Sequence, residues 1–294
     1  MVGPYLGGLV LAVAAGAAAG CIVHDDDRVV QRETKQFSVS GEPDITLETF
    51  DGSLRIRSWD RNEVLVEIEK RGASSEDVDR LEIRATQEGD RIRVEALPAA
   101  AGTTVTFSGR SPSVAFVVSV PRRTRLRAQT GDGSVQLDEL EGDISISSGD
   151  GAITAQSLRG RLRVNTGDGS IRISDADGAV EVDSADGSVH IEGRLQGVRV
   201  STADGSVRVE ARDGSAVESD WELTTGDGSI VLRLPGSVDA DVDAESADGR
   251  VDADGTFTTV RRSDEGGWLR GRLGRGGRAI RLRSGDGAVR LIAE

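Results

Sequence analysis

Aspartate is the residue whose spacing in this sequence could do chemistry, because it recurs at one place in a repeated motif. The motif reads Thr/Ser-Gly/Ala-Asp-Gly-Ser/Ala, with one exception at its last position. Five copies begin at a constant interval, at Thr130, Ser148, Thr166, Ser184 and Thr202, and further copies begin at Thr225, Ser246 and Ser284. The motif contains eight aspartates: Asp132, Asp150, Asp168, Asp186, Asp204, Asp227, Asp248 and Asp286. A fixed period over so many copies indicates a repeat architecture.

These aspartates have two interpretations. If the repeats stack, the carboxylates form a column with a spacing of about 5 Å. Calcium binds carboxylate and carbonyl oxygens, so it is the one cofactor that the column suggests. In the structural interpretation, each aspartate accepts N–H bonds in its own turn and the next glycine, such as Gly169, has a positive φ. We favour the turn and expect no bound cofactor, because the sequence lacks the glycine-rich nonapeptide of calcium β-rolls.

A second candidate site is an insertion rich in arginine and glycine at residues 261–283. Eight arginines stand there against Asp264 and Glu265, a local charge of +6 in a chain whose net charge is −14. Such a segment is either a patch for a polyanion, for example a phosphorylated envelope glycan, or a solvated loop against the acidic turns. The candidate residues are Arg261, Arg262, Arg270, Arg272, Arg275 and Arg278. The acidity of the chain argues against a nucleic-acid partner.

Cys21 is the only cysteine and ends an apolar segment. Residues 2–23 carry no charged side chain, and the segment closes with Ala18-Ala19-Gly20-Cys21. This pattern looks like a bacterial lipoprotein signal, which predicts a signal peptide at 1–20, lipidation of Cys21 and a flexible tether over 21–36. An ordinary cleaved signal peptide and an uncleaved anchor are the alternatives, and all three predict export of the remaining chain.

Catalysis is not expected from this composition. The two histidines are His24, in the predicted tether, and His190, at an outward strand position. Serine and aspartate occur throughout the turns, so no nucleophile with its base can be picked out. We therefore predict a protein that is not an enzyme. A β-helical enzyme that cleaves polysaccharide with paired carboxylates is the alternative in this class.

Two short strands in each repeat must position these residues. Apolar residues alternate with polar ones after the Asp-Gly turn and again later in the repeat, as in Ile171, Ile173, Val180 and Val182. This alternation is typical of strands with one buried face. Asp-Gly also favours hairpins, so an antiparallel meander competes. We favour an all-β fold, a β-solenoid of about 18-residue coils with two short strands per coil, because no long amphipathic helix is present to cover a meander.

The solenoid hypothesis divides the chain. We predict an N-terminal cap with irregular first coils over 37–120, then a regular solenoid over 121–294 that contains the insertion at 261–283. Terminal repeats of such arrays are atypical because they cover the ends of the core.

One family resembles this sequence. The Gly-x-Ile/Val-x-Val alternation with Asp-Gly turns, preceded by Val118-Ser119-Val120-Pro121, is similar to the bacterial "putative adhesin" family of β-strand repeats, a domain of unknown function. The resemblance covers residues 37–294 and implies a β-helical solenoid associated with the cell envelope. We therefore predict an exported protein, facing the periplasm or the cell surface, held to a membrane by its N-terminal lipid. It would act as a non-enzymatic binding or structural module for an envelope glycan or protein, or in envelope-stress sensing.

Overall fold

The computed structural model describes residues 22–25, 28–97 and 111–294. The predicted all-β class is confirmed, since strands follow one another throughout these ranges with a single short helix, α1 (Ser75–Asp79). No helix in these ranges has the length and apolar character needed to cross a membrane. Cys21 and the predicted signal peptide lie outside the described residues.

The strands fall into an irregular N-terminal group and a repetitive group. The first group comprises β1 (Ile22–Asp25), β2 (Arg28–Ser38), β3 (Asp44–Thr49), β4 (Leu54–Trp59), β5 (Glu63–Gly72), β6 (Glu82–Glu88), β7 (Arg91–Leu97), β8 (Ser113–Pro121) and β9 (Arg125–Thr130). The second begins with β10 (Val135–Asp138), β11 (Glu141–Ser148), β12 (Ile153–Gln156), β13 (Arg159–Thr166), β14 (Ile171–Ser184), β15 (Val189–Thr202), β16 (Val207–Ala211) and β17 (Trp221–Thr225). It ends with β18 (Ile230–Leu234), β19 (Ala240–Ser246), β20 (Val251–Gly255), β21 (Phe257–Arg262), β22 (Trp268–Leu273), β23 (Ala279–Ser284) and β24 (Val289–Ala293).

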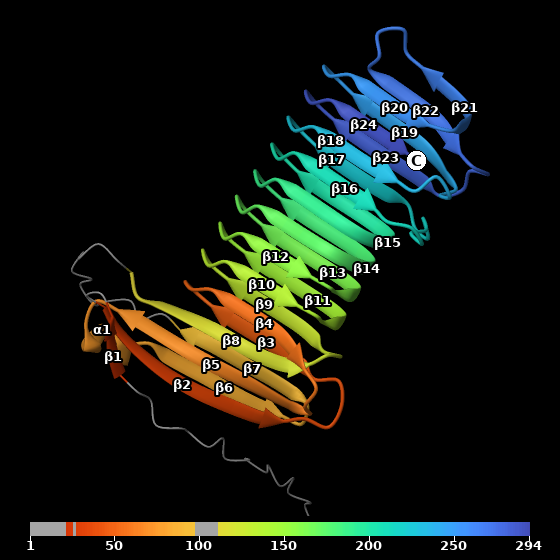
Figure 1. Ribbon diagram of the computed structural model, residues 1–294. Helices are drawn as coiled ribbons and strands as arrows, with labels where there is room; N and C mark the ends of the chain where they lie inside the picture. Colours follow the sequence, from red (N-terminus) through yellow and green to blue (C-terminus); the bar gives the residue numbers. More distant parts are fainter. Residues whose placement is uncertain (1–21, 26–27, 98–110) are drawn as a thin grey trace, which may run out of the picture.

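The repetitive strands pair in parallel, and in the central part each pairs with the equivalent strand of the next repeat. Ile144 of β11 is opposite Leu162 of β13, and Leu162 is opposite Val180 of β14. Two series of strands result, and they run side by side along the elongated molecule in Figure 1. The first series runs β4, β10, β12, β14, β15, β16, β18. The second runs β3, β9, β11, β13, β14, β15, β17.

The Asp-Gly turns join a strand of the second series to a strand of the first. They do not close antiparallel hairpins, because β9 pairs in parallel with β11 and β10 in parallel with β12. Strands β14 and β15 are long enough to belong to both series, and their pairing shifts register between Ile173 and Ala176 and again between Gly178 and Ala179. The meander alternative is therefore wrong for these repeats.

The core lies between the two series and is built from stacks of equivalent apolar side chains. Ile153, Ile171, Val189 and Val207 form one such stack, and each is at most 2% exposed. Full burial of a side chain of this kind stabilises the fold by about 1.5–3 kcal/mol. Each repeat contributes only a few of them, so a repeat depends on its neighbours for order.

The N-terminal group departs from the parallel pattern. Strands β2, β5 and β8 pair antiparallel, as do β6 and β7, while β4 pairs in parallel with β8. Residues 28–36, which the sequence places in the tether, belong to β2, and residues 29–36 are paired with β5. Val29, Val30 and Phe37 are buried in this strand. Its charged residues have cross-strand partners, such as Glu69 for Arg32 at 2.7 Å, so the polar composition there belongs to an exposed strand face.

The C-terminal repeats are not stacked in sequence order. Strand β23 lies between β17 and β19, and β24 lies between β18 and β20. The motif that begins at Ser284 is therefore placed between those that begin at Thr225 and Ser246. Strands β21 and β22 form an antiparallel pair on the outer edge of β19, at the end of the molecule marked by the blue ribbons in Figure 1.

Candidate functional site

The eight motif aspartates are exposed, one in each repeat, along one side of the stacked turns. Their order along the stack is Asp227, Asp286, Asp248 at the C-terminal end, following the strand order there. Their carboxylates make no hydrogen bond to the described residues, and in these ranges no three His, Cys, Asp or Glu side chains gather where they would hold a metal ion. The hydrogen bonds that the turn interpretation gives to these carboxylates are not formed within the described ranges, and the calcium interpretation stays a prediction.

The first residue of the motif provides the turn contacts instead. Its hydroxyl group donates to a carbonyl of the adjacent repeat, as Thr202 does to Ala185 at 2.8 Å. The same hydroxyl accepts from the second glycine of its own motif, as Thr202 does from Gly205 at 3.2 Å. The equivalent hydroxyls are buried at Thr130, Ser148, Thr166, Thr225, Ser246 and Ser284. In the sequence, only the constant spacing of these threonines and serines pointed to this role.

The glycine after each motif aspartate is needed for space. The expectation of a positive φ is wrong at Gly169, whose φ lies outside the left-handed region. A Cβ atom there would lie 2.7 Å from the carbonyl carbon of Gly151 and still closer to its oxygen. Equivalent glycines of successive repeats thus stack backbone on backbone, and a side chain would separate the repeats.

The arginine-rich insertion is largely neutralised by β19. Asp241 and Asp243 lie on this strand and Asp239 in the turn before it, and each pairs with arginines of the insertion. Asp239 pairs with Arg275 at 2.8 Å, and Asp241 pairs with Arg272 at 2.9 Å. Asp243 pairs with both Arg270 at 3.4 Å and Arg283 at 2.7 Å. Of the remaining candidates, Arg261 and Arg262 lie on β21 and Arg278 lies near Asp220. The six candidate arginines therefore do not form one unpaired patch, and the expected loop is mostly strand.

These contacts lower the pKa of the aspartates. The Arg272 side chain and the Gly277 N–H hold the pKa of Asp241 below its usual value, and the Arg275 backbone and side chain do the same for Asp239. Burial opposes the shift at Asp243, but hydrogen bonds from Arg283 and Arg270 still lower its pKa. The carboxylates on the outward face of β19 thus hold β22 against it through ion pairs.

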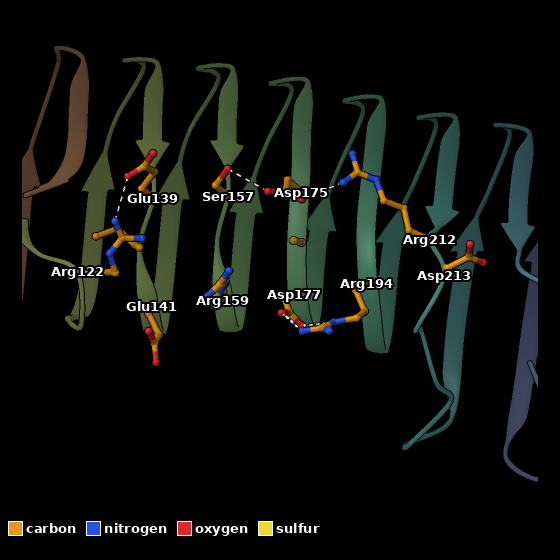
Figure 2. Close-up of a pocket in the computed structure, with 12 residues that line it drawn as sticks. Arg122, Glu139, Glu141, Ser157, Arg159, Asp175, Asp177, Arg194, Arg212 and Asp213 are labelled. Carbon is orange, nitrogen blue, oxygen red and sulfur yellow. Dashed lines mark hydrogen bonds and ion pairs between the residues drawn. The ribbon is translucent and has the colours of Figure 1, made fainter.

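A groove at the opposite corner of the repeats is the candidate site that the structure adds. Figure 2 shows it across several strands, and its volume is about 410 Å³. Glu139, Ser157 and Asp175 occupy equivalent positions in successive repeats, and all three have a left-handed backbone with φ of 57°, 54° and 55°. This conformation is uncommon for residues other than glycine, and such strain gathers at functional sites.

The groove is lined by charged side chains that are mostly paired. Arg194 donates to Asp177 at 2.9 Å, Arg212 lies 2.9 Å from Asp175, and Ser157 donates to Asp175 at 3.1 Å. In Figure 2, Arg159 lies between these groups without a partner, and it makes no ion pair within the described ranges. No residue of this corner stood out in the sequence as a candidate for binding. The glycines that recur at 142, 160 and 178 were the available signal.

The carboxylates of the groove are held in ion pairs. Asp175, Asp177 and Glu139 each pair with an arginine side chain. The pKa of Arg194 is raised by Asp177 and that of Arg212 mainly by Glu192, so these arginines stay cationic. The groove therefore offers fixed donors and acceptors.

A row of alternating charges runs along the outward face of the second series. Cross-strand neighbours in this row, called here the charge row, are in order Arg163, Glu181, Arg199, Glu222, Arg281, Asp243 and Arg270. Ion pairs join Arg163 to Glu181 at 2.9 Å and Arg199 to Glu222 at 2.6 Å. Opposite charges on neighbouring strands support the pairing register.

Comparison with known proteins places the chain in a family. The model of the Toastrack DUF4097 family matches residues 43–291. Comparison with curated proteins gives no match. Among solved structures, a "putative adhesin" from Bacteroides fragilis is similar over 90% of this chain and 97% of its own, with 13% identity and a TM-score of 0.42. A "putative lipid binding protein" from Parabacteroides distasonis is similar over 88% and 96%, with 15% identity and a TM-score of 0.41. With most of its length matched by the family model, this chain belongs to the Toastrack DUF4097 family.

Proposed function

We propose that this chain is a lipid-anchored protein of the bacterial cell envelope whose β-solenoid binds an elongated polar ligand, an envelope glycan, without transforming it. Parallel pairing at a constant sequence offset supports the solenoid, because the chain returns to an equivalent point in each central repeat. The single observation that carries the binding role is the groove of Figure 2, which crosses consecutive repeats.

The lining of the groove suits a polyhydroxylated ligand. Sugar hydroxyl groups both donate and accept, and the groove presents carboxylate acceptors beside guanidinium donors. Its ion pairs hold these groups in place before a ligand arrives, which reduces the entropy lost on binding. Arg159 has no competing carboxylate partner in the described ranges and is the donor we assign to the ligand. Because equivalent positions repeat along the rod, an extended chain matches the groove better than a compact molecule.

The binding role is tested with the full-length protein in detergent. We expect the protein to bind purified peptidoglycan strands, or the polysaccharide part of lipopolysaccharide, without cleaving them into smaller sugars. Replacing Arg159 by Ala should weaken retention about tenfold, the effect of losing one charged hydrogen bond. Arg172→Ala is the matched control, since Arg172 is exposed on β14 and does not line the groove. Equal retention by both variants would contradict the proposal, and released sugars would indicate an enzyme.

The anchoring is tested separately at Cys21. We expect Cys21→Ser to shift the protein from membranes to the soluble fraction, or to leave its precursor unprocessed. Mass spectrometry of the N-terminal peptide should detect acyl chains in the wild type alone. Normal processing with unchanged membrane partition of the variant would rule out the lipoprotein hypothesis and leave the binding proposal standing.

A further inference from the structure

The charge row breaks at Ser145. From Arg163 to Arg270, each step to the next strand changes the sign of the charge. In the other direction, the residue that follows Arg163 is Ser145, where the alternation calls for an acid. The next residue is again an arginine, Arg127, and beyond it Thr46 takes the second acidic position. Arg127 therefore lies between two uncharged neighbours.

A positively charged surface pocket is centred on this break. It has a volume of about 240 Å³, and its charged lining consists of Arg125, Arg127, Arg161, Arg163, Asp44 and Asp143. Four arginines against two aspartates leave a net charge of +2 in a chain of net charge −14. Within the described ranges, Arg125, Arg127 and Arg161 make no ion pair, whereas Arg163 pairs with Glu181. Most of the cationic groups here thus lack a carboxylate partner.

We infer that the Ser145 pocket binds a sulfate or phosphate group. Arg127 and Arg163 stand on the strands to either side of Ser145, so their backbones are about 10 Å apart, twice the spacing of paired strands. An oxoanion placed over Ser145 would accept from both guanidinium groups and from the serine hydroxyl. Arginine has five N–H donors, so Arg163 retains donors after pairing with Glu181. The anion takes the place of the carboxylate that continues the alternation elsewhere in the row.

The pocket differs in this respect from the arginine-rich insertion. There β19 and the turn before it supply carboxylates to Arg270, Arg272 and Arg275. At Ser145 the strand supplies a hydroxyl group in place of a carboxylate. This inference is independent of the glycan groove, because the two sites share none of their lining residues. The group bound here comes either from the free inorganic ion or from an anionic envelope polysaccharide.

The test is a substitution that places a carboxylate at position 145, where the charge row lacks one. The full-length chain is titrated with sodium sulfate at constant ionic strength while its melting temperature is recorded. We expect sulfate to raise the midpoint of the wild type by mass action, since the site exists only in the folded state. Ser145→Glu should fill the pocket, abolish the sulfate-dependent rise and melt above the wild type in sulfate-free buffer. Arg127→Gln should weaken sulfate binding about tenfold or more, without that gain in stability.

Ser147→Glu is the matched control. Ser147 lies two residues after Ser145 on the same strand and face, but its cross-strand neighbours are Gln129 and Asn165. A glutamate at position 147 therefore adds the same negative charge outside the charge row. We expect this variant to keep the full sulfate response. The two sources of the anion are distinguished with dextran sulfate and unsulfated dextran. Tighter binding of dextran sulfate than of inorganic sulfate, lost in Ser145→Glu, identifies a polymer, and equal binding per sulfate identifies the free ion. An unchanged sulfate response in Ser145→Glu, or an equal loss in Ser147→Glu, would overturn the inference.

Discussion

The two glycines of each motif tolerate a side chain differently. At the first position three copies already carry alanine, at Ala185, Ala203 and Ala247, whereas the second position is glycine in all eight. A Cβ atom at Gly167 would lie 2.9 Å from the Gly149 oxygen, but at Gly169 it would meet the backbone of Gly151 much more closely. Space between adjacent repeats, rather than backbone conformation, thus explains the invariance of the second position.

We therefore predict that Gly169→Ala is destabilising and Gly167→Ala is tolerated. Forcing an extra carbon into the closed stack at Gly169 should cost about 1–3 kcal/mol, as overpacking does in protein cores. Gly167→Ala should stay within about 0.5 kcal/mol of wild type, as for most surface substitutions. Denaturant unfolding of the two variants checks the difference, and equal stabilities would show that the stacked backbones move apart freely.

The motif aspartates should be nearly neutral to stability. Asp168 is exposed and makes no hydrogen bond to the described residues, and its neighbours along the column carry the same charge. We predict that Asp168→Asn changes the free energy of unfolding by less than about 0.5 kcal/mol and that melting is insensitive to chelator. The calcium hypothesis predicts the opposite: a melting temperature that rises with calcium, with the rise reduced in the variant. Thermal melts with and without EDTA decide between them.

At this scale the sequence located the repeated motif but misassigned its parts. Composition and spacing drew attention to Asp168 and its equivalents, which are charged and regular. The contacts are made by Thr166, Thr202 and their equivalents, because a small hydroxyl group fits into the buried corner. Turn statistics describe single turns, and they hold no information on a turn that stacks on another turn.

At the scale of secondary-structure elements, strand β19 and the β21–β22 pair are held together by ion pairs. The sequence showed a surplus of arginine at residues 261–283 and an alternating run from Asp239 to Glu245, but no rule connects two segments of unknown register. The structure places them opposite each other, and the surplus largely disappears. The charge row was hidden for the same reason, since its members come from seven different strands.

This docking should fail in acid. Asp239, Asp241 and Asp243 have pKa values lowered in the folded protein from an ordinary value of 3.8. A lowered folded pKa contributes stability that is complete above the unfolded value and is lost as the pH falls through the folded value. We predict that the β21–β22 pair loosens below about pH 3.8 and is fully docked at neutral pH. The fluorescence of Trp268, over which Arg270 lies at 5.6 Å, follows the change.

A variant separates this effect from general acid unfolding. Asp241→Asn removes the partner of Arg272 and should weaken docking already at neutral pH, leaving a smaller fluorescence change in acid. Subtracting the signal of a Trp268→Phe variant isolates Trp268 from Trp59 and Trp221. Identical acid profiles for the wild type and Asp241→Asn would show that these ion pairs do not hold the strands together.

On the scale of the whole molecule, the sequence predicted the all-β class and the repeats, and it failed at both ends. Alternation and a constant period identified the central repeats because each one obeys the same packing rule. Residues 29–36 looked like part of a tether, yet they pair with β5. At the other end nothing local reveals that β23 and β24 pack between earlier strands, because strand order depends on contacts far apart in sequence.

The position of β23 and β24 predicts an unusual sensitivity to truncation. A stop after Gly277 removes residues 278–294 and with them β23 and β24. Strands β17 and β18 then lose their partners on one side, and β19 and β20 lose the strands that connect them to the rest of the stack. Replacing residues 257–273 by a short Gly/Ser linker removes a segment of equal length from the outer edge. We predict that the first change lowers the melting temperature far more than the second. Comparable melting temperatures would mean that the C-terminal repeats do not support one another.

The inner placement of β23 and β24 also bears on the order of folding. These strands come after β19 and β20 in the sequence, but they lie between β17 and β18 on one side and β19 and β20 on the other. Strands β19 and β20 can therefore dock in their final place only together with β23 and β24. A chain released early by a premature stop would expose two unpaired strand edges, which are templates for aggregation.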